Sequence, residues 1–369
     1  MRGGVSACDG CLRRAYLVAE LAGRIAGLLD RPGRRTRALL ALDDDELIAA
    51  IAGDRAAELE RWRRRFTPST ARREMGAAGV AGVCRHADGY PAALRSLPDA
   101  PATVFAAGRA ELLARLAAGP VVTVVGTRRP SPYGSEMAYT LGRGLAAAGV
   151  HVVSGLAFGI DAAAHRGCLE GRAGRAVAVV AGGPDVAYPR RHRRLFERVR
   201  QDGVVVSEMP PGCRPFRWSF PARNRLMAAL GDVTVVVEAA DPSGSLITAE
   251  FAQDIGRTVG AVPGRATAWT AAGTNGLLRD GAAVIRSPQD VLDELFGPGV
   301  RVLPPTLPPA PEDPVLKRVL SALEHGDGVG AVASATGLSA AATRSALARL
   351  EIEGYLTRDP FGGYRGRPG

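Results

Sequence analysis

Short apolar runs alternate with amphipathic stretches through the middle of the chain. Residues 121–125, VVTVV, are apolar or β-branched throughout, as expected of a strand buried on both faces of a parallel sheet. A turn that no strand or helix continues through follows, Gly126-Thr127-Arg128-Arg129-Pro130. Apolar residues return at helical spacing over residues 135–148, Gly149 closes that helix, and a second strand is predicted at residues 151–153. The pattern predicts a β-α-β unit.

The same alternation of strand, turn and helix continues to about residue 296. Further strands are predicted at residues 176–181, 204–207, 233–238, 258–262 and 283–285. Each is followed by a helix or by a long glycine-rich loop, which is typical of a doubly wound parallel sheet. The predicted fold class is therefore α/β.

The flanking regions have different patterns. Residues 1–75 predict a helical domain rich in Ala and Leu, with a basic amphipathic helix that breaks at Pro68. After a sheet domain at residues 80–297, six prolines between residues 304 and 314 predict a stiff linker over residues 298–314. Residues 315–366 predict three short helices and a hairpin around Gly362-Gly363, the outline of a winged helix-turn-helix.

The charge narrows the class of partner. The 369 residues carry a formal net charge of +10, which favours a polyanionic partner, nucleic acid first and an anionic membrane second. No run approaches the roughly 18 apolar residues of a membrane span, so we predict no membrane association. Five cysteines, an odd number, predict a reducing, cytoplasmic location without disulfides.

Two cysteines have the spacing of metal ligands. Cys8 and Cys11 form a Cys-x-x-Cys pair, and no second such pair exists. Cys84 and His86 are the nearest residues that would complete a structural zinc site. Cysteines without metal remain the alternative that the sequence favours, so we predict no metal site and no cofactor.

The loops after the predicted strands carry the candidate chemistry, because ligands of open α/β sheets bind at the carboxyl edge of the strands. Glycines allow backbone N–H groups to approach an anion, and arginine matches phosphate oxygens. The first loop offers Gly126, Thr127, Arg128 and Arg129, and the second offers Ser154, Gly155, Phe158 and Gly159. Neither loop matches a dinucleotide-binding fingerprint or a nucleotide triphosphate loop.

Arginines and aromatic residues alternate in the later loops. The loop after residue 181 holds Tyr188 and a basic run that begins at Arg190. The next loop continues this mixture, with Arg214, Phe216, Arg217, Trp218, Phe220, Arg223, Asn224 and Arg225. Gly244 and Ser245 place another anion nest at a helix start. The combination suits single-stranded nucleic acid, with cations on phosphates and rings stacking on bases, although we expect about half of the rings to plug the sheet.

The acid and base groups at this edge have simpler roles than catalysis. Asp161 and Asp185 can cap turns, and His165 lies one helical turn beyond Asp161. Glu208 and Glu250 are the other candidates. Because no nucleophile-base pair, metal triad or cofactor fingerprint is present, we predict that the protein is not an enzyme.

Taken together, the motifs resemble one family. They stand in order between residues 125 and 282, and they read VGTRRPSPYG, SGLAFGIDAAAH, DVAYP, SEMPPG, FPARNR, SGSLITAE, AVPG and GTNGLLRDGA. The set resembles the DNA-processing protein A (DprA, or Smf) family. The resemblance implies an extended Rossmann fold and a cytoplasmic homodimer that binds and protects single-stranded DNA. It also implies loading of the RecA recombinase in natural transformation, with no established catalytic step.

By this resemblance the DNA pocket uses the first two loops and the basic position after the Tyr-Pro pair. These residues are Gly126, Thr127, Arg128, Ser154, Gly155, Gly159 and Arg190. The sequence departs from the family at Phe158, where many relatives carry arginine, and at Gly182-Gly183-Pro184. The first departure removes a charge and adds a stacking face.

Two other functions remain open from the sequence. Pro242, Gly244 and Glu250 are similar to the loop of lysine-decarboxylase-like phosphoribohydrolases, which cleave nucleoside monophosphates, although the Gly-Thr pair of that loop is replaced by Leu246-Ile247. A regulator that reads duplex DNA through its winged helix is the weaker alternative. Its recognition helix, residues 340–351, offers only Arg344 and Arg349 as DNA contacts.

Overall fold

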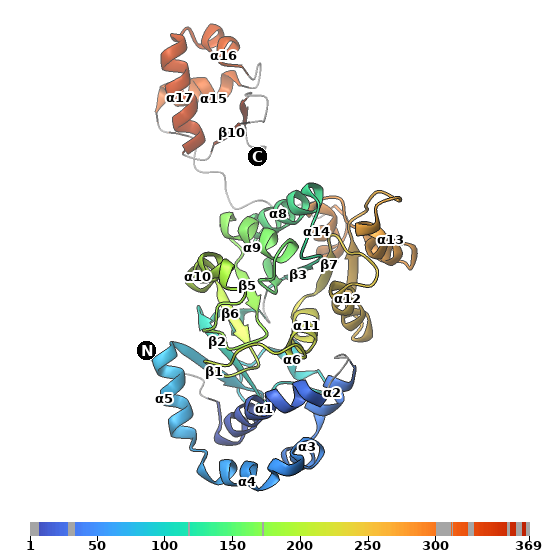
Figure 1. The fold of residues 1–369 in the computed structure, drawn as a ribbon. Coiled ribbons are helices and arrows are strands. Elements are labelled where there is room, and N and C mark those ends of the chain that lie inside the picture. The colour runs from blue at the N-terminus through green and yellow to red at the C-terminus, as the bar shows by residue number, and fades with distance from the viewer. Residues whose placement is uncertain are drawn as a thin grey trace. The chain divides into compact units, whose positions relative to one another are not determined.

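The chain folds as two compact units, Met1–Val302 and Leu303–Gly369 (Figure 1). This computed structural model describes residues 7–28, 34–116, 119–171, 173–299, 311, 313–323, 328–352, 355–358 and 364–366. The predicted helical and sheet domains both lie within the first unit. Most of the predicted linker, namely residues 300–310 and 312, lies outside the described residues.

A nine-stranded sheet forms the centre of the first unit, in the order β1-β2-β6-β5-β4-β3-β7-β8-β9. Neighbours from β6 to β9 pair in parallel, whereas β1 pairs with β2, and β2 with β6, antiparallel. The predicted doubly wound parallel sheet is thus confirmed, and an antiparallel pair that we did not predict extends one edge. The strands are β1 Val80–Cys84, β2 Thr103–Gly108, β3 Val121–Val125, β4 His151–Ser154, β5 Ala176–Val179, β6 Val204–Ser207, β7 Val233–Val236, β8 Thr258–Ala261 and β9 Ala283–Val284.

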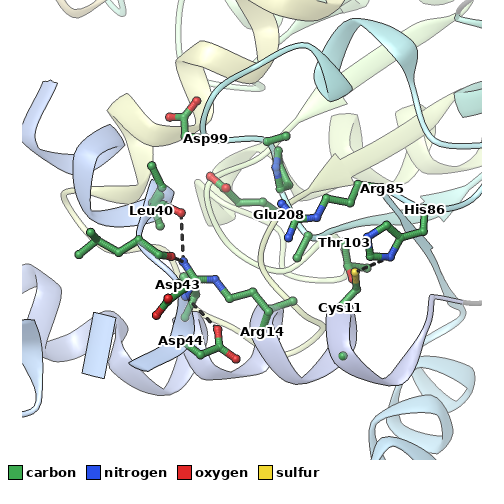
Figure 2. A pocket seen from close by; sticks show the side chains of 18 of the residues that line it. Cys11, Arg14, Leu40, Asp43, Asp44, Arg85, His86, Asp99, Thr103 and Glu208 are labelled. Carbon is green, nitrogen blue, oxygen red and sulfur yellow. Dashed lines mark hydrogen bonds and ion pairs between the residues drawn. The ribbon is translucent and has the colours of Figure 1, made fainter. Parts of the chain in front are cut away.

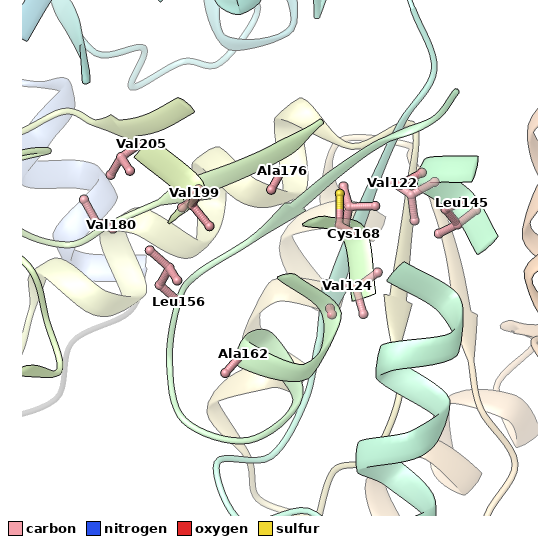
Figure 3. Packing of buried hydrophobic residues seen from close by; sticks show 14 of the residues in the cluster. Val122, Val124, Leu145, Leu156, Ala162, Cys168, Ala176, Val180, Val199 and Val205 are labelled. Carbon is pink, nitrogen blue, oxygen red and sulfur yellow. The ribbon is translucent and has the colours of Figure 1, made fainter. Parts of the chain in front are cut away.

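Both faces of the sheet are covered by helices, and each face has its own apolar core. Successive side chains of a strand point to opposite faces, so Val122 and Val124 of β3 enter one core while Val121 and Val125 enter the other. Figure 3 shows part of the first core, where Val122 lies near Leu145 of α8. Residues of α8, α9 and α10 contribute to this core, and residues of α11 and α12 contribute to the second. The helices of the sheet region are α6 Ala92–Arg95, α7 Leu112–Arg115, α8 Pro132–Ala147, α9 Ile160–Glu170, α10 Arg193–Asp202, α11 Ser219–Leu230, α12 Gly244–Asp254, α13 Ala272–Arg279 and α14 Pro288–Phe296. Short 3-10 turns are η2 Arg190–His192 and η3 Trp269–Ala271 in this region, and η1 Gly53–Arg55 between α3 and α4.

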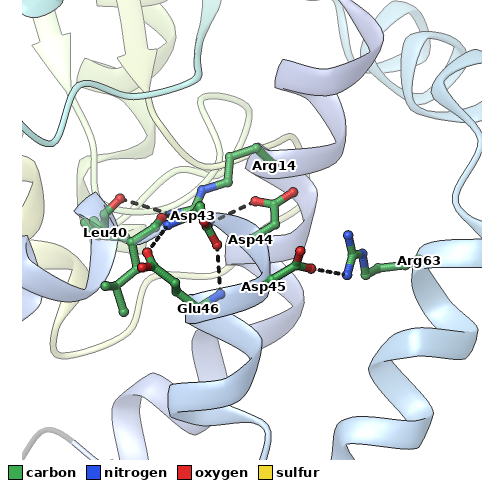
Figure 4. A network of polar contacts seen from close by, with 8 residues as sticks. Arg14, Leu40, Asp43, Asp44, Asp45, Glu46 and Arg63 are labelled. Carbon is green, nitrogen blue, oxygen red and sulfur yellow. Dashed lines mark hydrogen bonds and ion pairs between the residues drawn. The ribbon is translucent and has the colours of Figure 1, made fainter.

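The described residues that precede the sheet are mostly helical, as the sequence predicts. The basic helix breaks before Pro68, which begins the next helix, so this prediction is confirmed. Asp43 and Glu46 form a reciprocal capping box at the start of α3, with hydrogen bonds of 2.8 and 3.0 Å between side chains and backbone N–H groups (Figure 4). Arg14 and Arg63 bind Asp44 and Asp45 from the neighbouring helices at 3.0 and 2.7 Å. These helices are α1 Asp9–Leu28, α2 Arg34–Ala41, α3 Asp44–Ile51, α4 Ala56–Arg65 and α5 Pro68–Ala78.

The second unit has the winged-helix outline. Its three helices share one apolar core, and Gly337 ends α16 with a positive φ of 68°, a conformation that suits glycine. A short antiparallel hairpin follows, although the predicted wing residues Gly362-Gly363 lie outside the described residues. The elements are α15 Pro314–Ala322, α16 Val329–Thr336, α17 Ala340–Ile352, β10 Leu356–Arg358 and β11 Tyr364–Gly366. Across the described part of the chain, helices fall short of the length and hydropathy that membrane crossing requires.

Candidate nucleic-acid interface

A cleft of about 480 Å³ lies at the carboxyl edge of the sheet, beside β3 and β7. These neighbouring strands are the point at which the order of the sheet reverses, because the chain moves from β3 towards β4 on one side and from β7 towards β8 on the other. The loops that follow the two strands therefore diverge and leave a crevice between them. The cleft is lined by Val125, Gly126, Thr127, Arg128, Ala157, Asp161, Phe220, Pro221, Arg223, Asn224, Met227, Pro242, Ser243, Gly244, Ser245, Ile247 and Thr248.

Arg128 is the exposed cation of this cleft. Its guanidinium carbon lies 5.5 Å from the centre of the Phe220 ring, close enough for a cation–π contact. No carboxylate of the described residues lies within 4.0 Å of it. Asp161 instead binds backbone N–H groups, and Glu208 pairs with Arg225. The guanidinium is therefore available to an anion.

Arg223 places a second guanidinium in the same cleft, from α11. The residue is only 5% exposed, and its Nη1 donates a 2.6 Å hydrogen bond to the carbonyl of Val179. Gly155 makes this position possible, because a Cβ on Gly155 would lie 1.6 Å from Nη1. Burial lowers the pKa of Arg223 to about 10, and the nearby Asp161 partly offsets that effect. A buried cation with an unpartnered Nε is costly by itself, and an anion in the cleft would offset that cost.

Asp161 organises the second loop rather than reacting. Its Oδ2 accepts hydrogen bonds from the N–H groups of Gly155 and Ala157 at 3.1 and 3.3 Å. Burial raises the pKa of this carboxyl, and Arg223 opposes the rise. The expected turn-capping role of Asp161 is confirmed. Because the carboxylate occupies these two N–H groups, the second loop offers fewer backbone donors to a ligand than the sequence suggested.

The second loop packs closely against the first. Gly159 has a φ of 78°, and a Cβ there would lie 2.4 Å from the carbonyl oxygen of Thr127. Only glycine allows the two loops to approach so closely. Gly159 thus holds Thr127 and Arg128 in place without lining the cleft itself.

The helix N-termini at this edge differ in what they can bind. At α8, Glu238 occupies the N-terminus, since its Oε2 accepts from the N–H and the hydroxyl of Ser131, both at 2.9 Å. At α12, Ser243 is the N-cap and lies with Gly244 and Ser245 on the cleft wall. The dipole that faces the cleft therefore belongs to α12.

A smaller hollow of about 50 Å³ adjoins the cleft and is lined by three aromatic rings. Phe158 and Tyr188 are 38% and 49% exposed, and the Tyr188 ring lies 5.6 Å from that of Phe220. Arg128 and Arg223 line both spaces. The other two rings pack against the N-terminal helices: Trp218 is 1% exposed and donates to the carbonyl of Ala22, and Phe216 packs against the same cluster. The rings therefore divide into open and packed ones, but the packed rings contact the helices of residues 9–65 and do not plug the sheet as we expected.

Exposed arginines are frequent in the segments that follow β5 and β6. None of them has a carboxylate within 4.0 Å among the residues that the structure describes. They are Arg190, Arg191, Arg193, Arg194, Arg214 and Arg217. Arg129, in the first loop, is also exposed and has no such carboxylate partner.

The residues that the sequence singled out do not all meet. Eleven line the cleft or the hollow, namely Gly126, Thr127, Arg128, Gly155, Phe158, Tyr188, Phe220, Arg223, Asn224, Gly244 and Ser245. Arg129 and Arg190 are exposed but line neither space, and Ser154 is buried, donating to the carbonyl of Val124 at 2.7 Å. Arg225 is 2% exposed and binds Asp99 and Glu208 instead, so it does not face the cleft. Thr248, a hydroxyl residue of the same predicted anion nest, also lines the cleft one helical turn beyond Gly244.

The remaining acid and base groups do not assemble a reactive set. Glu250 is exposed and does not line the cleft, although the shallow hollow that it lines beside α12 shares Pro242, Ser243, Gly244 and Ile247 with the cleft. His165 is fully buried, and burial lowers its pKa to about 4. Among the described residues, Asp161 is the one acidic side chain in the cleft, and it is held by the second loop.

Comparisons with known proteins identify the family. The family model described as DNA recombination-mediator protein A matches residues 82–296, and the DprA winged helix domain matches residues 303–362. A protein Smf from Synechocystis is 34% identical over 311 residues, covering 75% of this chain and 78% of the relative. The DNA processing protein DprA of Streptococcus pneumoniae is 42% identical over 207 residues, covering 56% of this chain and 71% of that protein.

Two solved structures share the fold at 33% identity. The X-ray structure of DprA from Streptococcus pneumoniae covers 77% of this chain and 95% of its own, with a TM-score of 0.61. The second comes from Helicobacter pylori, and its description concerns the single-stranded DNA binding mode of that DprA. It covers 56% of this chain and 92% of its own, with a TM-score of 0.51. From its sequence motifs, its sheet and these matches, the chain belongs to the DNA recombination-mediator protein A (DprA/Smf) family.

Proposed function

We propose that the protein binds single-stranded DNA in the cleft at the switch point of its sheet. The observation that carries the proposal is the pair Arg128 and Arg223, two guanidinium groups in one cleft with no carboxylate bonded to Arg128. Guanidinium groups bind phosphate oxygens through two parallel hydrogen bonds. The description of the Helicobacter pylori relative, which concerns single-stranded DNA binding, supports the same partner.

The aromatic hollow favours a single strand over a duplex. Phe158 and Tyr188 present exposed faces next to the two arginines. A base stacks on such a face only when it is free of its complementary strand. Because stacking is tolerant of sequence, the expected binding has little sequence preference.

The role in the cell is the second part of the proposal. The protein would protect incoming single-stranded DNA as a cytoplasmic homodimer and help to load RecA during transformation or recombination, without a catalytic step of its own. The family supports recombination mediation. Binding is favoured over hydrolysis because backbone N–H groups engage Asp161 and because Glu250 does not line the cleft. Sedimentation equilibrium measures the dimer, and the DNA-dependent ATPase of RecA, assayed with and without the protein, measures loading.

A salt series tests the binding proposal. Fluorescence anisotropy should show tighter binding of a labelled oligothymidylate than of a duplex of equal length. The logarithm of the association constant should fall linearly with the logarithm of salt concentration, by about 0.7 for each phosphate contacted. Equal affinity for the duplex, or an affinity that salt does not change, would overturn the proposal.

A further inference from the structure

Three cysteines and one histidine converge where the first helix meets the edge of the sheet. Cys8 precedes α1 and Cys11 lies in its first turn, while Cys84 ends β1 and His86 follows two residues later. The ligand atoms of the four side chains all lie within 4.8 Å of one another. Figure 2 shows Cys11 and His86 facing each other from these two elements. Within the described residues this is the one group of its kind.

The distances suit a tetrahedral ion. Zinc bonds of about 2.3 Å to sulfur and 2.0–2.1 Å to nitrogen place neighbouring ligand atoms roughly 3.3–3.8 Å apart. The Sγ atoms of Cys8 and Cys11 each lie 3.5 Å from Nδ1 of His86. Because all four ligand atoms lie within 4.8 Å of one another, a small movement of the side chains would bring them to these distances.

The surroundings also suit a thiolate site. Cys11 and Cys84 are 4% and 3% exposed, whereas Cys8 and His86 are exposed to solvent. An ion can therefore enter from the side of Cys8 and His86, and the other side of the group is shielded from water. The backbone N–H of Cys8 points at Sγ of Cys84 at 3.5 Å, a contact that stabilises a sulfur carrying negative charge. A cavity of about 460 Å³ adjoins the group and is lined by Cys8, Cys11 and His86. Arg85, which lies between Cys84 and His86 in the sequence, lines the same cavity.

We propose that Cys8, Cys11, Cys84 and His86 bind one structural zinc ion, which replaces our expectation from the sequence of cysteines without metal. Four protein ligands leave no open position, so the ion would hold structure rather than activate water. It would join α1 to β1 across 76 residues of chain, next to the Ala7 N–H to Gly82 carbonyl bond of 3.1 Å. The cavity beside it shares no lining residue with the DNA cleft, so the inference stands apart from the proposed function.

Metal analysis of the full chain tests the site. Protein expressed with zinc and purified without chelators should contain one zinc ion per chain by inductively coupled plasma mass spectrometry. The double variant Cys8→Ser/Cys11→Ser should lose it. His86→Ala should also lose zinc or bind it far more weakly, and His86→Cys should restore it, because four thiolates form a zinc site as well. Cys213→Ser is the matched control, since this half-buried cysteine lies outside the group.

Cobalt absorption and thermal melting test the site in case a variant folds poorly. Cobalt substituted for zinc in the wild-type chain should give the strong visible absorption of a tetrahedral thiolate complex, and His86→Ala, which alters an exposed side chain, should abolish it. Chelation should lower the melting temperature of the wild type and of Cys213→Ser, and leave the double variant unchanged. Wild-type protein without metal, zinc retained in the double variant, or a Cys8–Cys11 disulfide in the mass spectrum would overturn the proposal.

Discussion

Replacing Arg128 with alanine is expected to weaken single-stranded DNA binding by about 1.5–3 kcal/mol, the range for hydrogen bonds to charged groups. That corresponds to a roughly 10- to 150-fold rise in the dissociation constant. The structure supports a value within this range because the side chain is exposed, lines both the cleft and the hollow, and gives its charge to no carboxylate among the described residues. Arg128→Lys should recover part of the loss, since an ammonium group cannot reproduce the two parallel bonds.

The same variant should barely affect stability. Arg128 makes one ring contact, with Phe220, and such an exposed contact contributes about 0.5–1 kcal/mol. Arg279→Ala is the control, because it removes an equal charge from the end of α13, where Arg279 is 81% exposed and pairs with Asp280.

Anisotropy titrations with oligothymidylate and thermal melts on the same protein samples measure both effects. The reasoning would be refuted by unchanged affinity in Arg128→Ala, by an equal loss in Arg279→Ala, or by a large fall in melting temperature.

Three further predictions concern the alternatives and the stability of the fold. Glu250→Ala should leave DNA affinity within about twofold, because the exposed carboxylate does not line the cleft; hydrolysis of adenosine monophosphate that this change abolishes would favour an enzyme. Truncation after Val302 should leave a first unit that melts cooperatively, and an insoluble product would show that the winged helix belongs to its core. Burial lowers the pKa of His165 from 6.5 to about 4, so between these values the unfolded chain binds a proton that the folded chain does not, and stability should fall as pH falls, by up to about 3 kcal/mol. The free energy of unfolding, measured by urea denaturation, should change less with pH between these values in His165→Leu than in the wild type. An equal change with pH in the two proteins would contradict a neutral, buried His165.

The central sheet was predictable from the sequence because strands buried on both faces of a parallel sheet have continuous apolar sequences. β3 is buried along its whole length, and its VVTVV run has no other simple interpretation. β1 and β2 were harder to recognise, since VAGVC and TVFAAG mix small residues with few β-branched ones. Their antiparallel direction depends on the path of the chain between the strands, and the local sequence of each strand does not determine that path.

The site shows the same division between local and distant information. Arg128 and Phe220 were predicted from the character of their loops, and they meet in the structure. Arg223 and Arg225 looked equivalent in the sequence, yet helical geometry turns them to different sides, one to the cleft and one to Asp99. The use of Glu238 to close the N-terminus of α8 joins residues 107 apart in the chain, and no local pattern predicts it.

The location of the bound strand is the central claim, and hydrogen–deuterium exchange with and without oligothymidylate tests it most directly. Bound DNA should slow exchange in the segments that line the cleft and the hollow. These segments are the loops after β3 and β4, the segment that leads into α11, and the first turn of α12. Exchange in α1 and α3 should not change, because these helices do not line the cleft or the hollow. Protection confined to α17 or to the N-terminal helices, with the loop after β3 unaffected, would contradict the account.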